Sequence, residues 1–368
     1  MAESTPLIIG AGVAGLAMAL GWRQSHGVTP LVCERFPVAA SQGFGFLLLP
    51  RGLQALRALG VDVASELSPH PIDHVRLITP AGETLAEHGL AKGTMALDRM
   101  RLLQALGSRL DPSQLRYGYQ VETLNRVESR VTTVRFRGQP DLCVDLVFGA
   151  DGAVSRTRRA LLERPGEPWM PGVAARVQEV VAMVDRPSLA ARLGSGLLKI
   201  VVPGGGVAVG LLPLGGGNLV WFVQFDTQRH GRPSAEGALP FLERLLPAFP
   251  GWVREVIATT APELPHHWRP LDLDPPMRLV GANIALLGDA AHPLLPFTSQ
   301  GVNLALEDAC LLRDLLHDTR GDAEVEAALR AYERQRLPLL RHYVAAGRLM
   351  AAHFVAPGQA EAALPVAL

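Results

Sequence analysis

The chain has 368 residues, long enough to bury a full core and to form two domains or one large domain with an insertion. Lysine and arginine together number 35, as do aspartate and glutamate, so no overall electric field attracts nucleic acid or an anionic membrane. This balance argues against a polyanionic substrate.

The sequence also predicts the compartment. The N-terminus lacks the basic region and apolar run of a signal peptide, and no apolar stretch is long enough to span a membrane. We therefore expect a cytoplasmic protein without stable membrane insertion, although the apolar segment 345–368 leaves a peripheral membrane contact open. Cys33, Cys143 and Cys310 lie in apolar stretches without a paired spacing, which predicts buried thiols in a reducing compartment. No metal site is predicted.

The first segment predicts a βαβ unit that binds a dinucleotide. Residues 7–9 are typical of a strand, and Gly10, Gly12 and Gly15 follow with G-x-G-x-x-G spacing before a helix. Gly10 permits the tight turn, Gly12 lets the backbone approach a pyrophosphate, and Gly15 lets the helix pack closely on the strand. The phosphates would bind free N–H groups at the helix N-terminus, so Ala14 in this turn is also a predicted cofactor residue.

Glu34 decides which dinucleotide we expect. It ends the second strand, nineteen residues after Gly15, where a carboxylate accepts hydrogen bonds from ribose hydroxyls and repels a 2′-phosphate. The ligand is therefore predicted to be FAD or NAD rather than NADP, although the neighbouring Arg35 weakens the exclusion of a phosphate. The alternative is a plain glycine turn followed by a surface glutamate.

The next segments predict a helix ending at Gly60, two strands around a turn at 80–82, and a helix with an apolar stripe at 102–110. Arg99 lies just before this stripe, where it could bind a diphosphate or be an ordinary solvated arginine. A further strand ends at "GADG", residues 149–152, before a basic helix.

The region from 166 to 275 differs in composition from the segments before it. Proline and glycine clusters separate the strand-like runs "LLKIVV", "VAVGLLPL" and "NLVWFVQF". This pattern predicts an antiparallel sheet of hairpins inserted between pieces of the α/β domain.

The C-terminal region begins with a strand, 283–287, that is interrupted by Gly288 and Asp289. Two helical segments follow, one with an apolar stripe over 302–316 and one from 324 to about 349. Pro338 is predicted to kink or divide the second helix.

Three ordered motifs now agree: G-x-G-x-x-G with Glu34, "GADGAVSRTR" at 149–158 and "GDAAHPLLPFTSQG" at 288–301. Together they resemble the single-component (group A) FAD-dependent aromatic hydroxylases, the family whose best-known member acts on p-hydroxybenzoate. The resemblance runs essentially from end to end. Three motifs in the family's order are more specific than any one of them.

The resemblance implies an α/β fold in which a Rossmann-type FAD-binding domain carries an inserted antiparallel or mixed β-sheet domain for substrate and ends in C-terminal helices. It assigns the FAD-binding domain to 1–70, 98–165 and 276–368, and the substrate-binding domain to 71–97 and 166–275. The implied ligands are FAD, NADPH or NADH as electron donor, O2, and an apolar, aromatic small molecule of aromatic or secondary metabolism. We expect no nucleic acid partner and a monomer or homodimer.

The resemblance also gives roles to residues of the second and third motifs. Asp151 and Arg158 match a fingerprint that contacts both FAD and the pyridine nucleotide, and Arg99 matches an arginine near the FAD diphosphate. Gly288 and Asp289 would meet the ribityl chain, where a carboxylate accepts hydrogen bonds from hydroxyls. The alternatives are a capped helix for Asp151 and a turn cap for Asp289.

The loop after the third motif would pass the flavin ring. Pro296 would stiffen it, and the N–H groups of Gly301, Val302 and Asn303 at a helix N-terminus would face the N1–C2=O edge of reduced flavin. The family loop usually reads Pro-x-x-Gly-Gln-Gly, whereas this chain has Ser299 in place of the first glycine, which puts the loop conformation in question.

The chemistry implied is reduction of FAD by the pyridine nucleotide, addition of O2 at flavin C4a, and oxygen transfer from the hydroperoxide to an electron-rich ring or an alkene. The sequence indicates no base for substrate deprotonation, and His292 is interpreted as a structural loop residue. Aromatic residues make up only 5% of the chain, which predicts a mainly aliphatic pocket. Four side chains that could cover the flavin are interpreted as packing or loop residues: Trp221, Phe222, His267 and Trp268.

Four other functions stay open at this point. An FAD-dependent reductase of a prenyl or alkene substrate could use the same fold, and it would work without oxygen. A halogenase is disfavoured because the chain has no W-x-W-x-I-P run. A flavin-binding protein without turnover and a plain NAD dehydrogenase are more remote, since all three cofactor motifs are intact.

Overall fold

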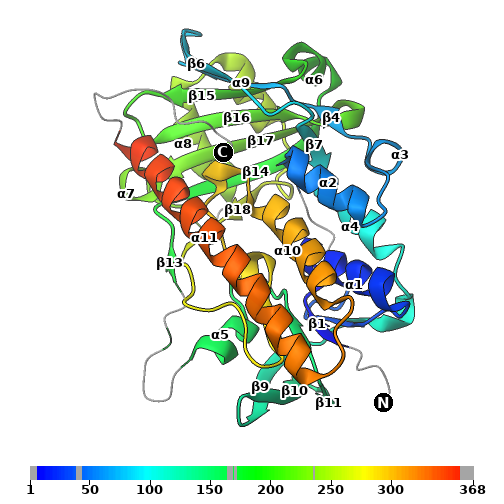
Figure 1. Ribbon diagram of the computed structural model, residues 1–368. Coiled ribbons are helices and arrows are strands. Elements are labelled where there is room, and N and C mark those ends of the chain that lie inside the picture. The colour runs from blue at the N-terminus through cyan, green and yellow to red at the C-terminus, as the bar shows by residue number, and fades with distance from the viewer. Residues whose placement is uncertain (1–5, 39–43, 164–168, 170–171, 235–236, 357–368) are drawn as a thin grey trace.

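The computed structural model describes residues 6–38, 44–163, 169, 172–234 and 237–356. Two large sheets lie at opposite ends of this part of the molecule, and the long helix α11 (Asp322–Val355) runs along both of them (Figure 1). Within the described residues, no helix is long and apolar enough to cross a membrane. Half of the apolar segment 345–368, residues 357–368, lies outside the described residues.

The first sheet confirms the Rossmann-type fold. Its five strands are all parallel. Three of them are buried along their whole length, as expected when helices cover both faces: β1 (Leu7–Ile9), β12 (Val147–Gly149) and β20 (Ile284–Leu286). Helix α1 (Val13–His26) packs between this sheet and α10 (Gly301–Leu316). In spatial order the strands are β20 (Ile284–Leu286), β12 (Val147–Gly149), β1 (Leu7–Ile9), β2 (Leu31–Glu34) and β8 (Leu115–Tyr117).

The second sheet contains the three strand-like runs of the middle region, together with two strands from earlier in the chain. Every neighbouring pair is antiparallel except β15 with β5, so the sheet is mixed. The exact domain boundaries stay a prediction. In spatial order the strands are β18 (His266–Trp268), β14 (Val177–Asp185), β17 (Asn218–Asp226), β16 (Val207–Pro213), β15 (Gly196–Val202), β5 (His74–Ile78) and β6 (Thr84–Gly89).

The two faces of this mixed sheet have different neighbours, because successive side chains of a strand point to opposite faces. Val180, Leu198 and Trp221 belong to one face, which forms a core with helices α8 (Ala238–Leu245) and α9 (Gly251–Ala258). The alternate residues face a cavity. Part of this second face, including Leu212 and Val220, also packs against Leu47 and Ala96.

Smaller elements complete the described part of the chain. The helices are α2 (Pro50–Ala58), α3 (Val63–Leu67), α4 (Arg99–Gly107), α5 (Arg156–Leu162), α6 (Pro187–Leu193) and α7 (Thr227–His230), with short 3-10 turns η1 (Pro112–Gln114), η2 (Gly215–Gly217), η3 (Leu246–Ala248), η4 (Gly288–Ala290) and η5 (Pro296–Thr298). The remaining strands are β3 (Gly45–Leu48), β4 (His70–Pro71), β7 (Met95–Asp98), β9 (Val121–Val127), β10 (Arg130–Phe136), β11 (Gln139–Cys143), β13 (Val173–Ala174) and β19 (Leu271–Asp272).

One local prediction is answered in part, and another was wrong. Pro338 does not divide the last helix, because α11 continues through it and buries Arg336, Leu340 and Val344 on both sides of the proline. A kink at Pro338 stays a prediction. Cys143 is exposed, because it ends β11, an edge strand of the small sheet β11-β10-β9. The stripe predicted over 302–316 is confirmed as the buried face of α10.

Candidate active site

The glycine turn after β1 has the shape that a dinucleotide requires. Gly10 has φ +107°, and a Cβ there would lie 2.3 Å from the carbonyl oxygen of Ala150. A Cβ on Gly15 would lie 1.9 Å from the Gly10 oxygen, whereas one on Gly12 would meet nothing within 4 Å. No side chain caps the N-terminus of α1, so its first N–H groups are available to a phosphate, with Ala14 buried behind them.

Glu34 closes this turn from the end of β2. One carboxylate oxygen accepts a hydrogen bond from the Ala11 N–H at 2.8 Å, and the other accepts one from the Phe36 N–H at 3.1 Å. Each oxygen keeps a lone pair for a ribose hydroxyl. Arg35 is turned away toward the cavity, with its guanidinium 4.9 Å from the centre of the Phe36 ring.

Arg99 and Asp289 approach Glu34 from two other elements. Arg99 begins α4, and its charge interacts with both carboxylates. The Asp289 carboxyl faces the cavity. Desolvation by the surrounding protein raises its pKa, and the charges of His292, Arg99 and Arg158 act in the opposite direction. A Cβ on Gly288 would lie 2.6 Å from the Ala14 Cβ, so this glycine lets the third motif approach the first.

The second motif has a structural function in addition to its predicted one. Asp151 accepts hydrogen bonds from the Ser155 hydroxyl at 2.5 Å and from the Arg156 N–H at 2.8 Å, so it caps α5. Arg158 is 1% exposed and donates to the carbonyl oxygens of Asp289 and Ala290. The predicted nucleotide contacts of Asp151 and Arg158 stay predictions, but Arg158 clearly positions the third motif.

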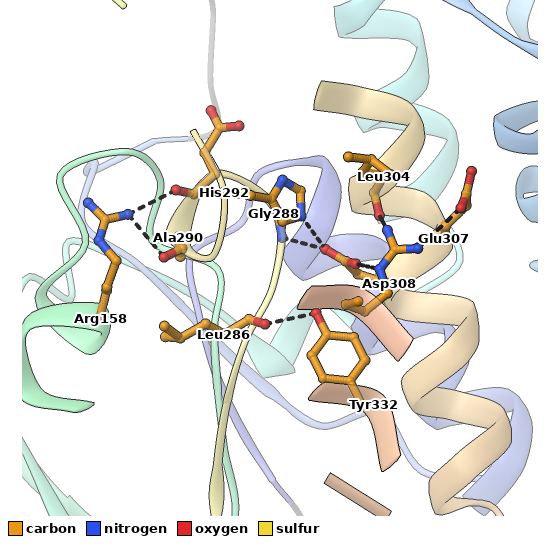
Figure 2. A network of polar contacts seen from close by, with 11 residues as sticks. Arg158, Leu286, Gly288, Ala290, His292, Leu304, Glu307, Asp308 and Tyr332 are labelled. Atoms are coloured by element: carbon orange, nitrogen blue, oxygen red, sulfur yellow. Dashed lines mark hydrogen bonds and ion pairs between the residues drawn. The ribbon is translucent and has the colours of Figure 1, made fainter. Parts of the chain in front are cut away.

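Asp308 of α10 fixes the third motif from the other direction (Figure 2). One of its carboxylate oxygens accepts the Gly288 N–H at 2.9 Å and contacts His292 Nε2 at 2.7 Å, and the other lies 2.6 Å from Arg336 Nε. Burial acts to raise the pKa of Asp308, but the charges of Arg336 and His292 outweigh it and lower the pKa to about 2. His292 is buried, in accordance with its structural interpretation.

The predicted flavin-edge loop leads into α10. Pro296 begins η5, and Gly301 begins α10, whose N-terminus carries no side-chain cap. The Asn303 side chain accepts the Leu49 N–H at 2.8 Å and donates to the Ser299 carbonyl at 2.8 Å. Ser299 has φ +54° and ψ +22°, the left-handed conformation that glycine adopts without strain. The loop therefore keeps a conformation suited to glycine.

A cavity of about 1140 Å³ extends from this loop to the mixed sheet. Val302, Asp289 and Arg99 line one side, and aliphatic side chains are the most numerous, as the composition predicts. Phe222 and Trp268 also line it, but Trp221 and His267 do not; they bind Thr260 and Gln178 instead. The lining includes seven large aromatic side chains: Phe36, Phe44, Phe46, Phe222, Trp268, Phe297 and Phe354.

Sequence reasoning missed three polar residues of this cavity: Glu179, Lys199 and Gln224. Each is less than a tenth exposed. A signal was present for each residue separately, because Lys199 is the single polar residue of "LLKIVV", and Glu179 and Gln224 lie in otherwise mainly apolar strands. Charged residues almost never lie in such strands without a partner or a function.

The glycine turn, the convergence of Glu34, Arg99 and Asp289, and the two uncapped helix N-termini fit FAD. Together with the doubly wound sheet and the cavity, they define a flavin-dependent oxidoreductase. The chain belongs to the family described as FAD binding domain, whose model matches residues 3–346, and it is a member of the group A flavin-dependent aromatic hydroxylases. It is an FAD-dependent monooxygenase.

Individual relatives agree with this assignment. The chain is 33% identical to a 3-amino-4-hydroxybenzoate 2-monooxygenase from Streptomyces cremeus, over 95% of this chain and 87% of that protein. It is 28% identical to an aurachin C monooxygenase/isomerase from Stigmatella aurantiaca, over 93% and 87%. Among solved structures, a variant of HpxO from Klebsiella pneumoniae complexed with FAD has a TM-score of 0.83 and 26% identity, over 96% of this chain and 91% of that one.

Proposed function

We propose that this enzyme hydroxylates, or epoxidises, an aromatic small molecule, with NADPH or NADH as the electron donor. The observation that carries the proposal is the cavity between the flavin-edge loop and the mixed sheet, because aromatic and aliphatic side chains line it on several sides. A ring in this cavity would lie beside Pro296 and Val302.

Bound FAD would supply the reduction of O2 and the electrophilic oxygen. The residues of this chain would bind and orient FAD and would exclude water from the site. Gly12 and the N-terminus of α1 would hold the diphosphate, Glu34 the ribose and Asp289 the ribityl hydroxyls. The N–H groups of Gly301 to Asn303 would stabilise negative charge on the reduced ring, and the apolar cavity walls would exclude water from the site of oxygen transfer.

Oxygen uptake, measured together with NAD(P)H oxidation, tests this function. FAD-loaded protein would be assayed with a panel of phenols, quinolones, polyketide aromatics and polyprenyl compounds. We expect one of these compounds to stimulate oxygen uptake and to become heavier by one oxygen atom. Nucleotide oxidation that continues without oxygen and saturates an alkene would establish a reductase instead.

The matched control is Gly10→Ala, in which the added methyl group meets the Ala150 carbonyl. This variant is expected to lose FAD and activity while its far-ultraviolet circular dichroism is unchanged. A cytoplasmic location and a monomeric or homodimeric state belong to the same proposal; sedimentation velocity would test the second.

A further inference from the structure

Two of these three buried polar residues of the mixed sheet form a directly bonded pair. Glu179 on β14 and Gln224 on β17 are partners in the strand register, and Gln224 Nε2 donates to Glu179 Oε1 at 2.5 Å. The two residues are 6% and 3% exposed, respectively, yet both line the cavity. The hydrogen bond fixes one carboxylate oxygen and leaves the second oxygen of Glu179 without a hydrogen bond to any residue that the structure describes.

Lys199 lies on the same face of the sheet, on β15, three strands from β14. Its Nζ lies 5.5 Å from the centre of the Phe297 ring and 5.4 Å from that of Phe354. Within the described part of the chain it forms no ion pair or hydrogen bond. Phe297 belongs to η5 in the flavin-edge loop, so this ammonium group lies next to the place where oxygen transfer would occur.

The pKa values of Glu179 and Lys199 both lie near neutral pH. Burial raises the pKa of Glu179 to about 7, against the Gln224 hydrogen bond and the charge of Lys199. Burial lowers the pKa of Lys199 to about 8, against the charge of Glu179. Groups with such values exchange protons readily at working pH. The other charged or titratable groups of the cavity are Arg35 after β2, Arg99 of α4, His266 of β18, Arg269 after β18, Asp289 of η4 and His353 of α11.

We propose that Glu179, oriented by Gln224, accepts the proton of a ring hydroxyl of the substrate, and that Lys199 stabilises the resulting oxyanion. This proposal rests on the proposed function. It narrows the substrate to aromatic compounds with an ionisable ring hydroxyl, and it excludes their ethers.

The step balances without a further reactant. The O–H bond of the substrate breaks, and its electron pair stays on oxygen and is delocalised into the ring. The proton bonds to the free oxygen of Glu179, which becomes a neutral carboxylic acid. The negative charge thus moves from the carboxylate to the substrate, where it is next to Lys199 and makes the ring more reactive toward an electrophilic oxygen.

Binding of 3-nitrophenol tests the step without turnover, because its anion absorbs at longer wavelength than its neutral form. FAD-loaded protein would be titrated at a pH one unit below the pKa of the free probe. Calorimetry in two buffers of different ionisation enthalpy would count the protons released. We expect the bound probe to be the anion with no proton released, and 3-nitroanisole to bind at least tenfold more weakly.

Variants distinguish the role of Glu179 from that of Lys199. In Glu179→Gln, which keeps the shape and the Gln224 contact, anion formation is expected to release one proton per site to solvent. In Lys199→Met the bound probe is expected to stay neutral and to bind at least tenfold more weakly. Glu179→Gln/Lys199→Met removes both charges, so that neither is buried alone, and is expected to bind the phenol and its ether equally.

The control variant is Glu87→Gln, which changes an exposed carboxylate on β6 of the same sheet and should bind the probe like the original protein. A neutral bound probe in the original protein, or a proton balance unchanged by Glu179→Gln, overturns the proposal. Failure of the proposed function would appear differently, as FAD-loaded protein that consumes no oxygen with any compound although the probe is bound as its anion.

Discussion

Two of the groups of buried charges that the structure describes differ in how closely their ions are paired. Around Asp308, both carboxylate oxygens are occupied by Gly288, His292 and Arg336. Around Glu179, one oxygen is held by Gln224, and the cation, Lys199, contacts aromatic rings instead of the carboxylate. The first group has no room for a ligand, whereas the second lines a cavity.

The pKa values of Asp308 and Glu179 reflect this difference in pairing. Asp308 is held near 2, so its charged form is stabilised by the fold, but Glu179 is raised to about 7, so its charged form is destabilised. The comparison teaches that burial alone does not decide what an ionised side chain does. An ion in direct contact with its counter-ion holds structure together, and an ion without such a contact is available for chemistry.

The largest effect is expected from breaking the first group. Arg336→Met leaves Asp308 buried without its main cation and should lower the free energy of unfolding by about 3–5 kcal/mol. Urea denaturation followed by circular dichroism would measure it. The matched control is Arg330→Met on the exposed face of α11, where an i,i+4 pair with Glu326 is lost and less than about 0.5 kcal/mol should follow. A loss below about 1 kcal/mol in Arg336→Met would contradict the structural role.

Removing the charges of Glu179 and Lys199 should raise the free energy of unfolding instead of lowering it. The double variant Glu179→Gln/Lys199→Met replaces two poorly solvated charges by neutral side chains of similar size. We expect the free energy of unfolding at pH 7.5 to rise by about 1–4 kcal/mol. The same urea experiment measures it. A decrease would mean that this pair stabilises the fold in the way that Asp308 and Arg336 do.

The pH dependence of stability sharpens the contrast. Between pH 4.5 and about 7 Glu179 is ionised in the unfolded chain and protonated in the folded protein, so the folded state binds more protons and stability falls as the pH rises. The contribution of Glu179 to this slope should reach about 1.4 kcal/mol per pH unit, and the slope in Glu179→Gln should differ from that of the original protein by this amount.

Asp308 gives the reverse pH dependence. Its folded pKa lies below the ordinary 3.8, so its contribution is complete above pH 3.8 and is lost as the pH falls through about 2. Unfolding curves of the original protein and of Asp308→Asn over both pH ranges would show the two signs. Parallel curves for the protein and Glu179→Gln between pH 4.5 and 7 would contradict the raised pKa of Glu179.

The smallest effect concerns the loop that adjoins both groups. Ser299→Gly should stabilise the protein by about 0.5–1 kcal/mol, because serine is strained at φ +54° and glycine is not. Thermal unfolding would measure it. Ser108→Gly is the control, because Ser108 has φ −63° and its replacement should be slightly destabilising. Equal effects at both positions would show that the backbone conformation is not the cause.

Most of the fold could be predicted where the signal is local. The βαβ unit over 7–34 has strand, turn, helix and strand in one continuous stretch, and the carboxyl ends of parallel strands bring Gly10, Asp151 and Gly288 together. The pairing of β15 with β5 could not be predicted, because it joins residues more than a hundred positions apart in the chain. The sequence around each strand does not encode that register.

The clustering of the three polar sheet residues in the cavity was missed for the same reason. Glu179, Gln224 and Lys199 share a face only because three strand pairings have a particular register, and a shift of one residue would turn any of them to the helix side. The error at Cys143 was also contextual, because it depended on which strand lies at the edge of a sheet.

The alternation of side chains across the mixed sheet has a consequence for how this enzyme could change over evolutionary time. Val181, Leu212 and Val220 project into the cavity, whereas their chain neighbours Val180 and Trp221 belong to the core with α8 and α9. A mutation at an inward position can alter which ring is accepted and leave the core with α8 and α9 intact, and its cost is confined to the smaller cluster around Leu47 and Ala96. New specificities are thus reachable by single steps, without passing through unfolded ancestors.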